Sequence, residues 1–216
     1  MLLPLYVDLD GTLVATDTLW ESMVTFVKQH PMQAWRLLWW VRRGRAGFKA
    51  ALASGVKVDP EGLPYRKEVV EYIQDRKKQG GRVMLATAAH QTIADAIALH
   101  LNCFDGIIAT KDDGVNMAGK IKAHAIRSHA GGDFAYLGDH MIDIPVWRDA
   151  QECILLSTSQ RKSEKLVKSL GRPFDYVIES VAESFLMVLP KALRIHQWVK
   201  NILLFITSII FLNGGI

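Results

Sequence analysis

The sequence contains little cysteine and no long hydrophobic run, and both shortages narrow the class of protein. Its 216 residues include two cysteines, Cys103 and Cys153, which lie in apolar stretches without CxxC or metal-ligand spacing. This pattern predicts reduced, buried cysteines in a cytosolic protein rather than a disulfide framework. No signal peptide is expected, because the apolar start is short and leads directly into aspartates.

The longest apolar run lies near the C-terminus and is short for a membrane-spanning helix. It extends from Ile202 to Leu212, whereas a helix that crosses a bilayer needs about 20 apolar residues. Basic residues precede the run, and Trp198 and Lys200 stand at its entrance. We therefore predict that residues 191–216 form an amphipathic or apolar helix that enters a membrane. Residues 198–216 would attach the protein to the inner face of that membrane.

The charge of the chain is moderately basic and indicates an anionic partner. The sequence has 26 lysines and arginines against 22 aspartates and glutamates, a net charge of +4. Such an excess favours phosphates, acidic lipids or nucleic acid. Nucleic acid is not predicted, because the basic segments lack a recognisable reading motif. The sequence gives no indication of the oligomeric state.

Short apolar runs alternate with amphipathic segments through most of the chain. The apolar runs predict strands within residues 2–11, 81–89, 104–110, 133–139, 152–158 and 174–180. Helical spacing is found within residues 65–81, 91–101, 120–130 and 144–150. Strands that alternate with helices form βαβ units. The sequence therefore predicts an α/β fold with a Rossmann-like, three-layer core and a parallel sheet.

Residues 17–64 interrupt this alternation with helical patterns alone. We predict that they form a helical cap inserted after the first strand, and that residues 1–16 and 65–190 form the core. The cap segment is rich in tryptophan and basic residues: Trp20, Trp35, Trp39, Trp40, Arg36, Arg42, Arg43, Arg45 and Lys49. This combination favours a membrane–water interface. The alternative is a helical bundle with an aromatic core and a solvated basic end.

Two pairs of carboxylates follow predicted strands. Asp8 and Asp10 are two residues apart, so in an extended strand they point to the same side. Asp139 and Asp143 would share one face of a helix that began at Asp139. The carboxyl ends of parallel strands meet at one edge of a sheet, where ligands bind. Four converging carboxylates predict a hard cation such as Mg²⁺ beside a phosphate.

The order of these motifs resembles the haloacid dehalogenase (HAD) superfamily of phosphohydrolases. DxDGT occupies residues 8–12, a strand ends at Thr87, a lysine stands at 120 or 122, and GDxxxD occupies residues 138–143. The resemblance covers about the first 180 residues. The position of the cap resembles the phosphoserine-phosphatase-like branch.

The resemblance implies a role for each motif residue. Asp8 would be the nucleophile that forms an aspartyl-phosphate, and Asp10 the proton donor and acceptor. Gly11 would permit a tight turn, and Thr87 would bind a phosphoryl oxygen. Substrate-binding positions would also include Thr12 and Ala88.

The same resemblance implies a lysine and a metal site. The lysine of this branch opens a helix two or three residues after a glycine, which favours Lys122 over Lys120. It would neutralise charge on the transferred phosphoryl group. Mg²⁺ would be bound by the side chains of Asp8 and Asp139, by the backbone carbonyl of Asp10, and by Asp143 either directly or through water.

The tail carries a second resemblance. "RIHQWVKN" at residues 194–201 looks like the opening of an intramembrane prenyltransferase of the UbiA family. The two resemblances together imply a Mg²⁺-dependent phosphomonoester hydrolase that acts on a small or lipid-linked, polyprenyl-type phosphate. The alternatives are a phosphotransferase or mutase of the same superfamily, or a non-catalytic membrane-associated head domain of a prenyltransferase fusion.

Overall fold

The computed structural model describes residues 2–42, 44–56, 58–111 and 115–181. The chain divides into two compact units, Met1–Ala182 and Glu183–Ile216, and the described residues belong to the first. The predicted membrane-entry segment, residues 191–216, lies outside them. In the described part of the chain, the helices are too short or too polar to cross a membrane.

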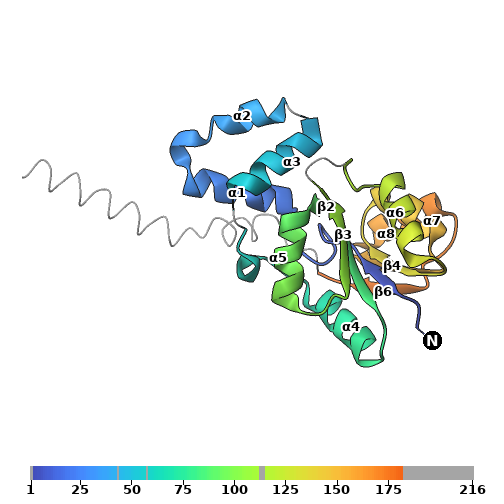
Figure 1. Ribbon diagram of the computed structural model, residues 1–216. Coiled ribbons are helices and arrows are strands. Elements are labelled where there is room, and N and C mark those ends of the chain that lie inside the picture. The colour runs from blue at the N-terminus through green and yellow to red at the C-terminus, as the bar shows by residue number, and fades with distance from the viewer. Residues whose placement is uncertain (1, 43, 57, 112–114, 182–216) are drawn as a thin grey trace, which may run out of the picture. The chain divides into compact units, whose positions relative to one another are not determined.

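A sheet of six parallel strands organises the described unit (Figure 1). Its order is β3-β2-β1-β4-β5-β6. The strands are β1 Leu5–Val7, β2 Val83–His90, β3 Gly106–Thr110, β4 Ala135–Gly138, β5 Glu152–Ser157 and β6 Tyr176–Glu179. The predicted α/β fold with a parallel sheet is thus confirmed. Strand β1 pairs with both β2 and β4, so the order of strands reverses at β1, which creates a crevice at the strand ends.

Helices cover both faces of the sheet because alternate strand residues point to opposite sides. Leu5 and Val7 join a cluster with helices α4 (Lys67–Lys78) and α5 (Gln91–Leu101). Tyr6 joins the opposite cluster. That cluster contains residues of α6 (Lys120–Ala130), α7 (Ile144–Asp149) and α8 (Gln160–Leu170). Cys103 and Cys153 are free and buried, as predicted.

Helix α8 is absent from the sequence prediction. Its N-cap is Ser159, whose side chain accepts a hydrogen bond from the Lys162 backbone, and it ends at Gly171 with φ of 82°. Leu166 and Leu170 are its buried residues. Its apolar residues Leu166, Val167 and Leu170 have helical spacing, and the serine cap and the glycine were further readable signals of this helix.

Three helices lie between β1 and α4 in the chain: α1 (Thr18–Gln29), α2 (Arg36–Val41) and α3 (Gly44–Gly55). We call residues 18–55 the helical insertion. The helical patterns expected within residues 17–64 are interrupted, because a 3₁₀ turn spans Pro31–Gln33 and α3 begins at Gly44, whose φ is 74°. The insertion has its own hydrophobic cluster, formed by Phe26, Trp40, Phe48, Leu52 and Val56.

Candidate active site

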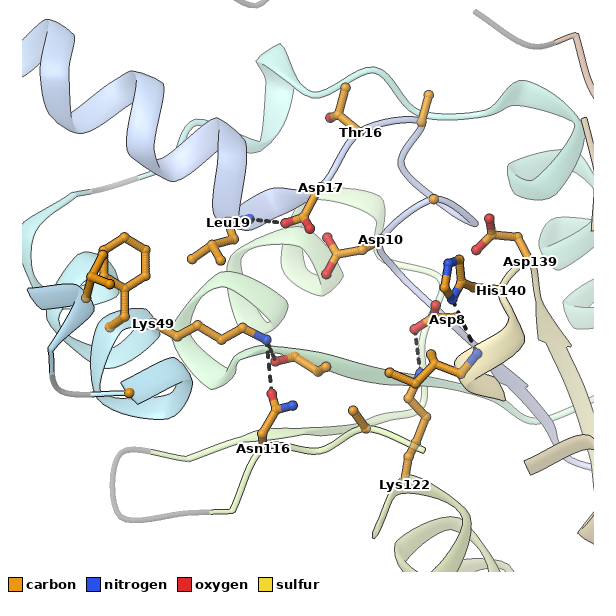
Figure 2. Close-up of a pocket in the computed structure, with 18 residues that line it drawn as sticks. Asp8, Asp10, Thr16, Asp17, Leu19, Lys49, Asn116, Lys122, Asp139 and His140 are labelled. Carbon is orange, nitrogen blue, oxygen red and sulfur yellow. Dashed lines mark hydrogen bonds and ion pairs between the residues drawn. The ribbon is translucent and has the colours of Figure 1, made fainter. Parts of the chain in front are cut away.

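A cavity of about 600 Å³ lies at the carboxyl end of the central strands (Figure 2). Strand β2 ends next to it, and helices of the insertion complete its wall. Leu19, Val41 and Lys49 line it from the insertion. The predicted site residues in its lining are Asp8, Asp10, Gly11, Ala88, Lys122 and Asp139. Thr12, Thr87 and Asp143 lie behind this lining.

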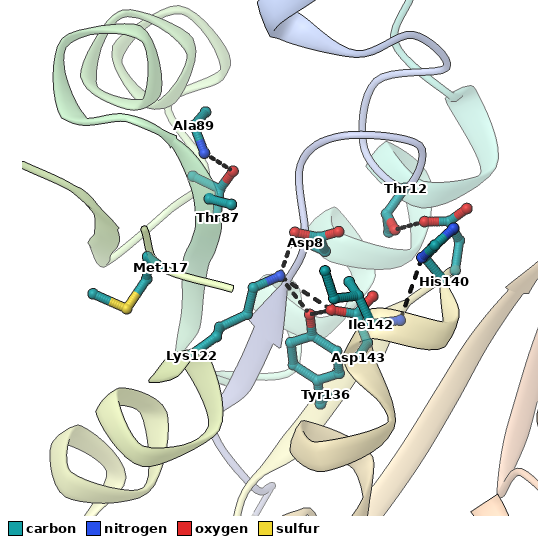
Figure 3. A network of polar contacts seen from close by, with 12 residues as sticks. Asp8, Thr12, Thr87, Ala89, Met117, Lys122, Tyr136, His140, Ile142 and Asp143 are labelled. Carbon is teal, nitrogen blue, oxygen red and sulfur yellow. Dashed lines mark hydrogen bonds and ion pairs between the residues drawn. The ribbon is translucent and has the colours of Figure 1, made fainter. Parts of the chain in front are cut away.

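Lys122 is the lysine that reaches the carboxylates. It is 2% exposed, whereas Lys120, at the first position of α6, is exposed. Lys122 Nζ donates hydrogen bonds to Asp8 Oδ1 at 2.8 Å and to Asp143 Oδ1 at 3.1 Å (Figure 3). It also lies 3.0 Å from the Tyr136 hydroxyl, which donates to Asp143 Oδ1 at 2.8 Å. A charge buried this deeply is stable only when it is paired, as here.

The buried charges of this network shift one another's pKa values. Burial raises the pKa of Asp8, the charge of Asp143 raises it further, and the Lys122 ammonium opposes both. Burial alone would lower the pKa of Lys122, but Asp8 and Asp143 outweigh it and raise that pKa. At neutral pH the lysine is therefore a fixed positive charge, and the carboxylates are held close together at an energetic cost.

Three carboxylates of the site fit a divalent cation. Oxygens of Asp8, Asp139 and Asp143 can lie within 4.8 Å of one another, and all three residues are buried. Asp143 Oδ2 has no hydrogen-bond partner among the residues that the structure describes. An unsatisfied buried carboxylate oxygen is costly, and carboxylate oxygens are the ligands that Mg²⁺ prefers. The donor set therefore suits a hard cation.

The chain brings these carboxylates together through tight turns. Asp139 and Asp143 do not share a helix, because a 3₁₀ turn spans Met141–Asp143 and α7 begins only at Ile144. Gly11 has φ of 81°, and a Cβ there would lie 2.9 Å from Asp139 Oδ1. Glycine is thus the residue that this turn requires.

Asp10 lines the same cavity as Asp8 but has different partners. Strand β1 ends at Val7, so strand alternation does not extend to the two aspartates. Asp10 Oδ1 accepts a hydrogen bond of 2.7 Å from the backbone N–H of Thr18, at the start of α1. Burial, and then the charge of Asp17, raise the pKa of Asp10 to about 6. The side chain of Asp10 is not part of the three-carboxylate cluster. The family resemblance implied that its backbone carbonyl, rather than its side chain, would bind the metal.

Thr87 and Thr12 lie behind the cavity wall. Thr87 is fully buried, and its Oγ1 accepts a hydrogen bond of 2.9 Å from the Ala89 backbone N–H. Thr12 Oγ1 donates to Asp139 Oδ1 at 3.2 Å. Phosphate binding by Thr87, Thr12 and Ala88 stays a prediction.

Sequence reasoning missed four polar residues of the site. Lys162, on the unpredicted helix α8, forms an ion pair of 2.6 Å with Asp139. Tyr136 stands two residues before Gly138 on β4, so the alternation of that strand could have placed it near the motif. Lys49 Nζ donates to the Ala88 carbonyl at 2.7 Å and to Asn116 Oδ1 at 3.1 Å. The sequence carries no signal for these last contacts, which join distant segments.

We expect Mg²⁺ to stabilise the protein through this carboxylate cluster. A ligand present at about 100 times its dissociation constant adds about 2.7 kcal/mol, which corresponds to roughly 5–10 °C in Tm for a chain of this size. Thermal melting in Mg²⁺ and in chelator measures the difference. The Asp143→Asn variant should lose most of the shift, and Asp133→Asn, which changes an exposed aspartate, should keep it. An equal shift in both variants would contradict this site.

The fold and the geometry define an α/β protein with a lysine–carboxylate centre at the point where the strand order reverses. A family model described as haloacid dehalogenase-like hydrolase matches residues 41–148, half of the chain. The chain belongs to the haloacid dehalogenase-like hydrolases. The prediction of a HAD-type hydrolase is thereby confirmed.

One curated relative and two solved structures are similar to this chain. An uncharacterized protein of Sinorhizobium fredii is 32% identical over an alignment of 212 residues that covers 94% of this chain and 39% of that protein. The chain thus spans about two fifths of the length of this curated relative. A Bordetella pertussis protein of unknown function has a TM-score of 0.61 at 16% identity, over 81% of this chain and 97% of that one. A phosphoserine phosphohydrolase-like protein of Francisella tularensis has a TM-score of 0.53 at 18% identity, over 82% of this chain and 94% of that one. These two structures show the fold.

Proposed function

We propose that the protein is a Mg²⁺-dependent phosphomonoester hydrolase that works through an aspartyl-phosphate on Asp8. The observation that carries this proposal is the buried bridge of Lys122 between Asp8 and Asp143, next to a carboxylate oxygen without a partner among the described residues. Membership of the haloacid dehalogenase-like hydrolases supports it. The fold shared with a phosphoserine phosphohydrolase-like protein agrees with it.

In the first step, an Asp8 carboxylate oxygen attacks phosphorus, and the bond from phosphorus to the leaving oxygen breaks. Lys122 lowers the pKa of Asp8 against the effect of burial, which favours the carboxylate form, and it compensates negative charge on the phosphoryl oxygens. Asp10, whose pKa of about 6 leaves a protonated fraction near neutral pH, donates its proton to the leaving oxygen. When bound, Mg²⁺ supplies positive charge beside the transferred group.

In the second step, water attacks the phosphorus of the aspartyl-phosphate. The Asp10 carboxylate, which has given up its proton, accepts one from this water. The bond between Asp8 and phosphorus breaks, inorganic phosphate leaves, and Asp8 returns as a carboxylate. The hydrogen bond from the Thr18 backbone holds Asp10 at the junction with the helical insertion. The insertion acts as the cap that excludes bulk water during both steps.

The proposed substrate is a phosphomonoester on a membrane-associated, polyprenyl-type lipid. Its support is the resemblance of residues 194–201 to a prenyltransferase entry segment and the match of nearly the whole chain to part of a longer relative. A screen of polyprenyl phosphates beside soluble sugar, amino-acid and nucleotide phosphates tests this proposal. A strong preference for a soluble phosphate would contradict it.

Two rival functions have separate tests. A phosphotransferase or mutase would pass the phosphoryl group to an acceptor alcohol, so product analysis with and without that alcohol distinguishes it from a hydrolase. A non-catalytic head domain would show no Mg²⁺-dependent turnover of any phosphate.

We expect Lys49→Met to weaken substrate binding more than the chemical step. Lys49 connects α3 to the Ala88 carbonyl and to Asn116 across the cavity wall. Loss of these contacts, worth about 1 kcal/mol each, should loosen the insertion over the cavity and raise KM about tenfold, with a smaller change in kcat. The control is Lys67→Met, which removes an exposed lysine outside the insertion. A fall in kcat at constant KM would place Lys49 in the chemical step instead.

A further inference from the structure

The outer side of α2 and the turn before it form an exposed apolar surface. We call it the α2 face; its residues and exposed fractions are Met32 (89%), Trp35 (60%), Leu38 (76%), Trp39 (62%) and Val41 (61%). Met32 and Trp35 lie in the turn before α2, and Leu38, Trp39 and Val41 lie on the helix itself. Trp40, in contrast, is packed inside the insertion: it is 7% exposed, and the centre of its ring lies 4.9 Å from that of the Phe26 ring. Of the tryptophans at positions 35, 39 and 40, one thus packs in the core of the insertion and two are exposed.

Monomeric soluble proteins rarely expose apolar side chains so close together without a binding role. The charge of the segment that carries this surface indicates the kind of partner. Residues 22–58 contain seven lysines and arginines and no aspartate or glutamate. The Arg42 guanidinium lies 5.4 Å from the centre of the Trp39 ring, and that of Arg36 lies 5.1 Å from the Trp40 ring.

Tryptophan rings and arginine side chains with apolar stems are suited to the headgroup region of a bilayer. Each basic side chain near an anionic leaflet adds about 1 kcal/mol of attraction. A second copy of this chain would bring its own excess of positive charge to the same surface. The charge therefore complements an anionic lipid surface and disfavours self-association.

The α2 face is continuous with the mouth of the catalytic cavity. Val41, the last residue of α2, belongs to both the face and the cavity lining, and Gly44 at the start of α3 also lines the cavity. A membrane in contact with the face would therefore lie beside the cavity entrance. Phosphate groups of lipids would be at the depth where the cavity opens.

We propose that the α2 face docks the helical insertion on an anionic membrane and so presents the cavity to a lipid-linked phosphate. The choice of substrate rests on the proposed function, but the docking does not depend on catalysis. Two leucines of similar exposure allow a matched test: Leu38 on the face and Leu99, 83% exposed, on α5.

The test uses the full-length chain with Leu38→Cys or Leu99→Cys, labelled with the environment-sensitive fluorophore NBD. The unsubstituted chain reports any labelling of the two buried native cysteines. Each protein is mixed with vesicles of phosphatidylcholine alone or with phosphatidylglycerol. At position 38, we expect a blue shift and at least a twofold rise in emission with the anionic vesicles. Position 99 should not respond.

Several outcomes would overturn the docking proposal. One is vesicle binding, measured by flotation, with no change at position 38, since the chain would then attach elsewhere. Another is an equal response to neutral vesicles. A third is a blue shift at position 38 that grows with protein concentration in the absence of lipid, which would mean that a second copy occupies the face.

A double variant, Leu38→Gln with Trp39→Gln, links docking to activity. Neither residue lines the cavity, so hydrolysis of para-nitrophenyl phosphate should be unchanged. Hydrolysis of a polyprenyl phosphate in anionic vesicles should fall at least fivefold; an unchanged rate on vesicles would contradict the proposal. A protein that responds at position 38 but hydrolyses no phosphate would refute the proposed function and leave the docking intact.

Discussion

Asp8→Asn should lower phosphatase activity by at least about 1,000-fold, because removal of a nucleophile eliminates the covalent route. The fold should survive the change. Asn retains an oxygen that can accept the hydrogen bond from Lys122, and it removes one negative charge from the crowded carboxylates. In chelator, the Tm of the variant should therefore equal or exceed that of the wild type. Turnover of para-nitrophenyl phosphate and thermal melting measure the two effects.

The control for this prediction is Asp133→Asn, which replaces an exposed aspartate outside the cavity. Its activity should match that of the wild type. An Asp8→Asn protein that is folded and active would remove Asp8 as the nucleophile, whereas one that is inactive and unfolded would show that Asp8 is needed for folding.

Lys122→Met should reduce both activity and stability. Loss of the ammonium removes the charge opposite the phosphoryl oxygens, which costs about 100–1,000-fold in kcat for electrostatic groups of this kind. It also leaves Asp8 and Asp143 buried without their common partner. Breaking a buried pair costs about 3–5 kcal/mol of unfolding free energy. Lys120→Met, at an exposed position on the same helix, should change neither quantity.

The stability loss in Lys122→Met should depend on pH. The pKa of Asp8 is raised even with Lys122 present, and without the lysine it must rise further. A carboxyl whose pKa is higher in the folded than in the unfolded protein binds more protons when folded, so its stability falls as pH rises between the two pKa values. Because the pKa of Asp8 is already about 8 with Lys122 present, the two proteins lose stability in parallel below that pH and diverge above it. Urea unfolding in chelator should therefore give a larger loss at pH 9 than at pH 7.

Two results would count against this account of Lys122. A loss of stability that is constant across this pH range would contradict the link to Asp8 ionisation. Adding Asp8→Asn to Lys122→Met should recover part of the lost stability, because one of the buried charges then disappears. No recovery would mean that the two side chains are not energetically coupled.

Short-range patterns were sufficient to predict the parallel sheet and its motifs. Asp8 and Asp139 follow apolar strands, and the rule that parallel strands end at one edge is enough to bring them together. The choice between Lys120 and Lys122 needed the family resemblance, since both stand near the start of the same helix. The structure adds a physical reason, because only the second of them is on the buried side of α6.

The contacts that the sequence did not reveal join distant segments. Lys162 on α8 meets Asp139, which lies 23 positions earlier in the chain, and local patterns do not show which distant residue a surface lysine reaches. The tryptophans of the insertion divide between core and surface according to the side of α2 on which they stand. Trp40 faces Phe26, whereas Trp35 and Trp39 do not. That division needs the positions of α1 and α3, which local patterns do not provide.

The measurement that most directly tests the central claim is the chemical trapping of phosphorylated Asp8. In Asp10→Asn, activation of water is slowed, while para-nitrophenolate leaves without a proton, so the aspartyl-phosphate should accumulate. Borohydride reduces an acyl phosphate to the alcohol, which converts the aspartate to homoserine, and peptide mass spectrometry locates it. We predict homoserine at position 8 only when substrate and Mg²⁺ are present. Homoserine at another aspartate, or none at position 8 while the variant releases para-nitrophenolate, would contradict the account.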